Sequence, residues 1–200
     1  VCGTYPASVP VNLPGTQDPL TGQGYAGIVV QHGSPIPDYR EYIQTVLSEP
    51  LVAGFCYDLE MFTSAAEFWP MNGISHVGMY LSVSPPSISG NGQINVIPQV
   101  YYNNVVLDIN NWVPLTGTYV ATGGEQYLTI GNFYENGNFD IQPLDPPGGG
   151  TDAAYYYIED VKVELAQGGQ QDVEATICEG ECYEYEGQDY CAEGTYEIFV

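Results

Sequence analysis

Acidic side chains are the groups that this sequence offers most abundantly for chemistry. It contains 25 Asp and Glu residues against two basic ones, Arg40 and Lys162, which gives a formal net charge of −23. A glycosidase needs two carboxylates about 5 to 9.5 Å apart around the bond that it cleaves. Asp58 and Glu60 fall on one face of a predicted strand at about this spacing. Because 25 carboxylates always contain such a pair, we give it little weight and expect no catalysis.

The sequence lacks the motifs of nucleophilic catalysis and of zinc binding. Its only histidines are His32 and His76, and no GxSxG motif precedes a predicted helix. The five cysteines contain neither a CxxC pair nor the CxxCH motif of haem attachment, and no histidine lies near the three that cluster after residue 177. We therefore predict a protein that is not an enzyme and that holds no zinc.

Aromatic residues in or near predicted loops are the candidates for binding a ligand. Sugar rings stack on exposed aromatic side chains in a solvated groove, beside polar groups. The candidate carbohydrate-binding residues are Trp69, Tyr101, Tyr102 and Tyr134. The alternative, that these rings belong to the core or to an interface, stays open. We assign Trp112, Tyr127 and Phe133 to the core.

The net charge limits the partners that this protein can have. Affinity for nucleic acids and for anionic membranes comes largely from Lys and Arg, so we exclude both partners. No stretch reaches the ~20 apolar residues of a membrane span, and no signal segment opens the chain, so we expect that a signal has been removed or that this is an internal piece. Repulsion among the acids disfavours the compact state, and we expect divalent cations or salt to stabilise the fold.

The elements that must position these residues are predicted to be strands. Glycine (24), proline (15) and tyrosine (18) are frequent, whereas long helical patterns are rare. In Gly117–Phe133, two β-rich runs are broken by Thr122–Gly124, which predicts a hairpin of two antiparallel strands. Apolar and charged residues alternate in Val161–Leu165, which predicts an edge or closing strand of a sandwich.

Similar runs predict strands along the rest of the chain. They span residues 24–31, 55–63, 76–83, 94–101 and 112–121. The stretch Tyr39–Leu47 fits a helical face and a strand face equally well, so periodicity leaves both alternatives open. Asn136–Thr151 is rich in Gly, Pro, Asp and Asn and is predicted to be a loop, and Ala166–Gln171 is predicted to be a linker.

The last part of the sequence has its own composition and symmetry. Cys178–Val200 holds seven carboxylates and no basic residue. It is nearly mirror-symmetric about residues 186–187, which predicts a two-residue hairpin with a disulfide between Cys182 and Cys191. Thr195–Val200 forms an unfinished strand that could pair with the edge of another segment.

Three cysteines remain without an assigned partner. They are Cys2, Cys56 and Cys178. Because five is an odd number, one sulfur lacks a partner unless that partner lies outside these 200 residues.

Four ordered motifs between Val9 and Leu165 resemble a known family. They are VPVNLPGTQDPLTGQGYAGI, PDYREYIQTVLSEPLVAGFCYDLEMF, GTYVATGGEQYLTIGNF and AYYYIEDVKVE. Together they resemble a secreted jelly-roll domain of the large surface proteins that gliding bacteria export by the type IX route. That domain is similar in architecture to carbohydrate-binding modules of the galactose-binding type. The tail from Ile177 resembles the opening of the Cys-containing β repeats that follow such domains.

The resemblance implies a fold, a location and a metal site. The fold is all-β: a jelly-roll β-sandwich in residues 1–166, a linker at 167–172 and a partial β repeat with a hairpin at 173–200, and the YREYIQ segment is a strand. The protein is secreted or displayed on the cell surface. In the related sugar-binding jelly rolls a structural Ca²⁺ uses a carboxylate of the closing strand, which corresponds to Asp160 with Glu159 beside it. The alternative, an acid that faces solvent or bonds to a neighbouring strand, stays open.

We therefore expect a noncatalytic extracellular structural or adhesive module of a large bacterial cell-surface protein or filament. Its expected partners are neighbouring domains or copies of the same protein. The alternative is a carbohydrate-binding module that anchors a cell or an enzyme to polysaccharide. The family's usual first strand and a further cysteine of the repeat are missing, which implies that the polypeptide is longer.

Overall fold

The protein is described by a computed structural model. The described residues are 8–33, 36, 38–68, 70, 72–87, 92–145, 150–166, 182–185, 187–192 and 194. Three residues singled out above, Trp69, Cys2 and Cys178, lie outside them. The chain forms two compact units, Val1–Ala166 and Gln167–Val200. Within the described residues, no helix is long and apolar enough to cross a membrane.

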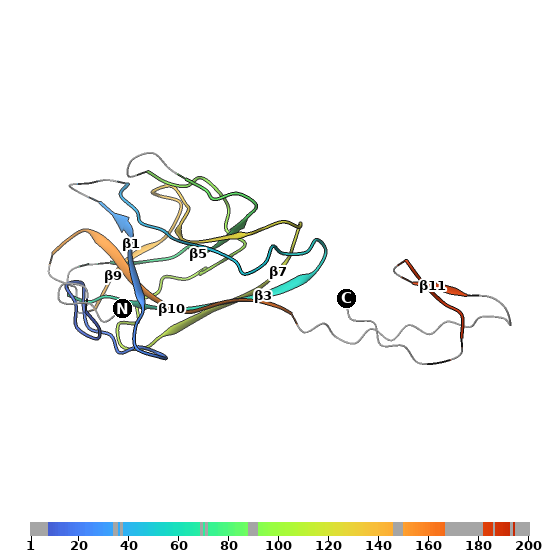
Figure 1. The fold of residues 1–200 in the computed structure, drawn as a ribbon. Helices are drawn as coiled ribbons and strands as arrows, with labels where there is room; N and C mark the ends of the chain where they lie inside the picture. Colours follow the sequence, from blue (N-terminus) through green and yellow to red (C-terminus); the bar gives the residue numbers. More distant parts are fainter. Residues whose placement is uncertain are drawn as a thin grey trace. The chain divides into compact units, whose positions relative to one another are not determined.

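The first sheet has four antiparallel strands. They are β1 (Ala26–His32), β3 (Cys56–Ala65), β7 (Val113–Val120) and β10 (Ala153–Leu165), in the spatial order β1-β10-β3-β7. β10 therefore lies inside the sheet, and of the two predicted alternatives, an edge or a closing strand, the edge strand is wrong (Figure 1). The alternation in Val161–Leu165 reflects only the far end of β10, because its first half, residues 153–158, is almost entirely buried.

The second sheet also has four antiparallel strands. They are β2 (Ile43–Val46), β5 (Val77–Ser82), β6 (Val100–Tyr101) and β8 (Tyr127–Asn132), in the order β2-β8-β5-β6. Two short strands, β4 (Asn72–Ile74) and β9 (Ile141–Pro143), pair with each other. The segment that fitted a helix and a strand equally well contains strand β2, as the resemblance implies. Of the strand predicted at 94–101, only β6 forms.

The two sheets share one hydrophobic core. Successive residues of a strand point to opposite faces, and the inward set of each sheet is apolar. The core includes Val30, Leu59, Met61 and Tyr156 from the first sheet and Met79, Leu81 and Ile130 from the second. Full burial of one such side chain contributes about 1.5–3 kcal/mol. The prediction of an all-β sandwich is confirmed.

A corner, and not a hairpin, joins β7 to β8. The two strands belong to different sheets, so the chain crosses between sheets at Thr122–Gly124, and the predicted pairing of these runs is wrong. Gly123 and Gly124 have φ angles of 99° and 87°, where a residue with a side chain would be strained. The amide of Gly124 donates to the carbonyl of Leu51 at 2.8 Å. Paired glycines indicate a change of direction, but they do not specify which strands pair.

Residues 8–25 cover part of the outer face of the first sheet. Tyr157 lies on that face, and its hydroxyl donates to Oδ1 of Asn12 at 2.6 Å. Trp112 Nε1 donates to the carbonyl of Asp18 at 3.0 Å. Tyr157 is therefore buried although it points away from the core. Trp112 is only half-buried, so its predicted place in the core is wrong.

The second unit contains a small hairpin. Its strands are β11 (Tyr183–Tyr185) and β12 (Gln188–Tyr190), which pair with Tyr183 opposite Tyr190. Cys182 and Cys191 form a disulfide with their Cα atoms 4.1 Å apart. Both the hairpin and this disulfide were predicted from the mirror symmetry, and both are confirmed. Cys56, in the first unit, is a free and exposed thiol.

Candidate functional site

Three rings from separate strands meet at the surface of the second sheet. His76 precedes β5, Tyr101 is in β6 and Tyr134 follows β8, and neighbouring positions in the sheet bring them together. The His76 ring lies 5.1 Å from Tyr101, in a stacked arrangement, and 4.6 Å from Tyr134. All three are half-buried. This group, called the aromatic cluster below, contains two of the predicted sugar contacts and a histidine that sequence reasoning did not assign to it.

A buried arginine positions the Tyr134 end of the aromatic cluster. Arg40 is 4% exposed, and its guanidinium donates to the carbonyls of Tyr134 and Asn132 and, at 2.8 Å, to Oδ1 of Asn136. It also lies over the ring of Phe139, 5.4 Å from the centroid. Burial lowers the pKa of Arg40, but a guanidinium stays charged at neutral pH. Burial and the neighbouring Tyr101 raise the pKa of Tyr134 to about 12.

The other two predicted sugar contacts are not part of this surface. Tyr102 is 8% exposed, and its hydroxyl donates to the carbonyl of Val113 at 2.7 Å and accepts from Thr63 Oγ1 at 3.1 Å. Burial raises the pKa of Tyr102 to about 12. Its ring is therefore a core element that offers no face to a ligand. Trp69 lies outside the described residues.

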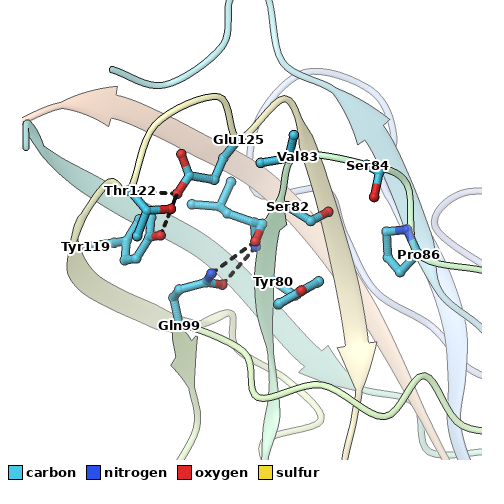
Figure 2. Close-up of a pocket in the computed structure, with 10 residues that line it drawn as sticks. Tyr80, Ser82, Val83, Ser84, Pro86, Gln99, Tyr119, Thr122 and Glu125 are labelled. Atoms are coloured by element: carbon cyan, nitrogen blue, oxygen red, sulfur yellow. Dashed lines mark hydrogen bonds between the residues drawn. The ribbon is translucent and has the colours of Figure 1, made fainter. Parts of the chain in front are cut away.

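A hollow of about 380 Å³ lies between the ends of β5 and β7 (Figure 2). Its lining mixes two aromatic rings with hydroxyl groups, an amide and a carboxylate, namely Tyr80, Leu81, Ser82, Val83, Ser84, Pro86, Gln99, Tyr119, Thr122 and Glu125. We call it the β5–β7 hollow. Ser82 Oγ is buried and has no hydrogen-bond partner among the described residues. No sequence pattern pointed to this place.

Gln99 closes the strand edge beside the β5–β7 hollow. Its side-chain amide accepts from the Leu81 amide at 2.8 Å and donates to the Leu81 carbonyl at 3.0 Å. These are the two bonds that a neighbouring strand would make, and Gln99 directly precedes the short strand β6. The Gln99 side chain thus satisfies an edge that would otherwise be open to another chain.

Glu125 holds the corner between the two sheets. Its carboxylate is 2% exposed and accepts from the Thr122 amide (2.9 Å), the Thr122 hydroxyl (2.6 Å), the Gly123 amide (2.9 Å) and the Tyr119 hydroxyl (2.6 Å). Figure 2 shows the Thr122 and Tyr119 side chains directed at it. Burial alone would raise the pKa of Glu125, but these hydrogen bonds outweigh it and lower the pKa to about 2.

Glu159 and Asp160 anchor a loop on the outer face of β10. Glu159 is 7% exposed, and its two carboxylate oxygens accept from the amides of Leu20 (2.6 Å) and Thr21 (3.0 Å). Asp160 accepts from the Thr21 hydroxyl at 2.7 Å and lies at a bulge with a φ of 48°. Each oxygen of Glu159 thus already accepts one amide proton, and its role as a calcium ligand stays a prediction.

Asp160 keeps one carboxylate oxygen outside these bonds, so the calcium hypothesis for this residue stays a prediction. Among the described residues there is no group of three or more His, Cys, Asp or Glu that could hold a metal ion. On the same sheet, Glu60 forms an ion pair with Lys162 at 3.2 Å, while Asp58 is exposed. The acid pair considered for glycoside cleavage therefore has one member engaged by a lysine.

The interior carboxylates share one role. Glu41 accepts from the Val29 amide at 2.8 Å and from the Tyr39 hydroxyl at 2.7 Å, which joins two segments of the first sheet's margin. Glu125 and Glu159 do the same for a corner and a loop. Each of these three carboxylates therefore positions backbone, whereas Glu67 Oε2 is buried without a hydrogen-bond partner among the described residues.

No protein-family model, curated protein or solved structure matches this chain. The type IX jelly-roll resemblance thus stays a prediction from the four motifs. The described residues offer stacking at the aromatic cluster, hydrogen bonding in the β5–β7 hollow and pairing at strand edges.

Proposed function

We propose that this chain is a noncatalytic extracellular module that serves a bacterial cell-surface protein as a structural or adhesive domain. The observation that carries the proposal is the use of the interior carboxylates. Glu41, Glu125 and Glu159 each accept hydrogen bonds from backbone amides. These three carboxylates hold a strand margin, a corner and a loop, which supports a structural role for them.

The jelly-roll topology and the extracellular location are parts of this proposal. Two four-stranded antiparallel sheets around one core are the frame on which a jelly roll is built, which supports the first part. Disulfides form and persist in oxidising surroundings such as the outside of a cell, and the Cys182–Cys191 bridge supports the second. A charge of −23 keeps such a module soluble and excludes nucleic acids as partners.

A second candidate function, carbohydrate binding, is favoured by the aromatic cluster. Half-buried rings whose centroids lie 4.6 to 5.6 Å apart present apolar edges and faces beside polar tips, which is what a sugar ring stacks on. The cluster is held in place by a buried guanidinium, so little entropy is lost when a ligand binds. Polysaccharide would then be the partner, and the module would anchor its parent protein.

One experiment on the full chain separates these functions from each other and from catalysis. Beads that carry the chain are washed over surfaces coated with polysaccharide or with protein, and soluble sugar released from the polysaccharide is measured in parallel. We expect the beads to be retained on a coated surface and no soluble sugar to be released from the polysaccharide. Tyr134→Ala should abolish retention on polysaccharide if the aromatic cluster binds sugar, whereas Tyr127→Ala, a half-buried tyrosine outside this cluster, should not. Heat-sensitive release of sugar in proportion to the amount of chain would refute a noncatalytic module.

A further inference from the structure

Strand β7 has one bonded edge and one open edge. It pairs with β3 over its whole length, Val113–Val120, and it ends the order of the first sheet. No other described strand pairs with it. Open strand edges present unpaired N–H and C=O groups and are templates on which another chain can add a strand.

The hydrogen bonds around β3 identify which groups of β7 are unpaired. Backbone groups alternate in direction along a strand. The Ala121 amide, just after β7, donates to the carbonyl of Phe55, just before β3, at 2.9 Å. The next carbonyl, that of Cys56, points the other way and accepts from the Ala166 amide, just after β10, also at 2.9 Å. Odd-numbered residues of β7 therefore bond to β3. The even-numbered residues direct their groups outward, and Pro114, Thr116, Thr118 and Val120 are all exposed.

The unpaired N–H groups of this edge have no hydrogen-bond partner among the described residues. They belong to Thr116, Thr118 and Val120, since Pro114 has no N–H. The edge has little of the usual protection, because no residue of Val113–Val120 is charged and its one proline, Pro114, lies at the start of the strand. By contrast, the edge of β5 next to it is closed by the Gln99 side chain. The edge of β7 thus has unpaired backbone groups, whereas those at Leu81 on the edge of β5 are paired by a side chain.

We propose that this edge accepts the segment Thr195–Val200 of a second copy as an added strand, so that copies join in a chain. This inference rests on the proposed function and specifies how such a module assembles. The sequence TYEIFV has six residues for the eight of β7, consists of strand-favouring residues except for Glu197, and contains neither Gly nor Pro. It lies outside the described residues.

Val113–Val120 and Thr195–Val200 are also segments with very little charge. With 25 acids against two basic residues, most surfaces of two copies repel each other. Val113–Val120 carries no charge and Thr195–Val200 carries one, Glu197, so these strands can approach at low cost. The remaining repulsion acts between exposed charges, which salt screens over about 8 Å at physiological ionic strength. Assembly should therefore strengthen as the salt concentration rises.

The test uses the full chain in sedimentation velocity at low and at physiological salt. We expect oligomers that grow with protein concentration and with salt. A chain shortened after Gly194 should be monomeric, and Thr118→Pro, which removes one outward N–H without touching a bond to β3, should weaken assembly at least tenfold. Thr118→Ala is the matched control and should assemble like the wild type. Circular dichroism shows that each variant is folded.

A synthetic peptide TYEIFV keeps the test decisive if Thr118→Pro fails to fold. The peptide should bind the shortened chain, and the full chain should compete with it for the same edge. Oligomers that persist in the shortened chain, as in direct pairing of β7 with β7, would overturn the proposal, and so would a wild-type chain that stays monomeric at every salt concentration. A monomeric chain that is still retained on the bead surfaces would remove this inference and leave the proposed function standing.

Discussion

Replacing Glu125 by Gln tests the role assigned to the interior carboxylates. The neutral amide keeps one acceptor oxygen, but it turns the other position into a donor that faces the Gly123 amide. Only the Gly123 amide bonds to Oε2, so this one bond is lost, whereas the three bonds to Oε1 remain but lose the charge of their acceptor. A hydrogen bond to a charged group contributes about 1.5–3 kcal/mol and a neutral one about 0.5–1.5 kcal/mol, so losing one bond and weakening three should lower the free energy of unfolding by about 3 kcal/mol at pH 7.

The pKa of Glu125 yields a similar magnitude and a pH window. The folded pKa is about 2, against roughly 4.3 for an unperturbed glutamate, and about two units correspond to about 3 kcal/mol. Because the folded pKa is the lower one, this stabilisation is fully present above the unfolded pKa. It is lost as the pH falls from about 4.3 towards about 2. The difference between wild type and Glu125→Gln should therefore shrink across that window.

Urea unfolding of both proteins at pH 7 and at pH 2.5 measures this difference, with tryptophan fluorescence as the signal. Subtracting the free energy of unfolding of Glu125→Gln from that of the wild type cancels the contributions of the other acids, because these titrate in both proteins. Glu49→Gln is the matched control, because Glu49 is exposed, and it should change the free energy of unfolding by less than about 0.5 kcal/mol. A Glu125→Gln loss below 1 kcal/mol at pH 7, or one that is equal at both pH values, would refute the reasoning.

Three further predictions follow from the described contacts. Tyr102→Phe should lower the free energy of unfolding by about 1 kcal/mol, because it leaves the Thr63 hydroxyl without an acceptor. Tyr101→Phe, in the half-buried aromatic cluster, should change it by less than about 0.5 kcal/mol, and urea titration of both variants measures the difference. Asp160→Val should lower the free energy of unfolding by about 1–2 kcal/mol, because Asp160 has a positive φ that a β-branched residue disfavours, and Asp160→Asn should lower it less. A melting temperature that does not fall when a chelator is added would remove Asp160 as a calcium ligand. Cys182→Ser should abolish slow amide exchange in the β11–β12 hairpin and leave the unfolding of the sandwich unchanged; in the wild type, a nonreducing digest that joins Cys178 to Cys182 or Cys191 would contradict the assigned disulfide.

Local pattern was sufficient wherever the relevant neighbours are close in the chain. Alternation predicted strands at β3 and β5 because solvent and core impose a period of two on each strand separately. The mirror symmetry of the tail predicted the hairpin and the Cys182–Cys191 bridge, since the partners are only nine residues apart. Composition alone set the net charge, from which we predict that nucleic acids are not partners.

Contacts between distant residues decided the rest. The alternation of Val161–Leu165 is real, yet β10 is an interior strand, because sheet order depends on partners about 100 residues away. The glycine pair was identified as a change of direction, but only the packing of two sheets makes it a corner with Glu125 beneath it. Likewise, adjacent tyrosines of one sequence motif separate into a surface ring, Tyr101, and a core ring, Tyr102, because successive side chains take opposite faces and only the assembled sheets determine which face meets water.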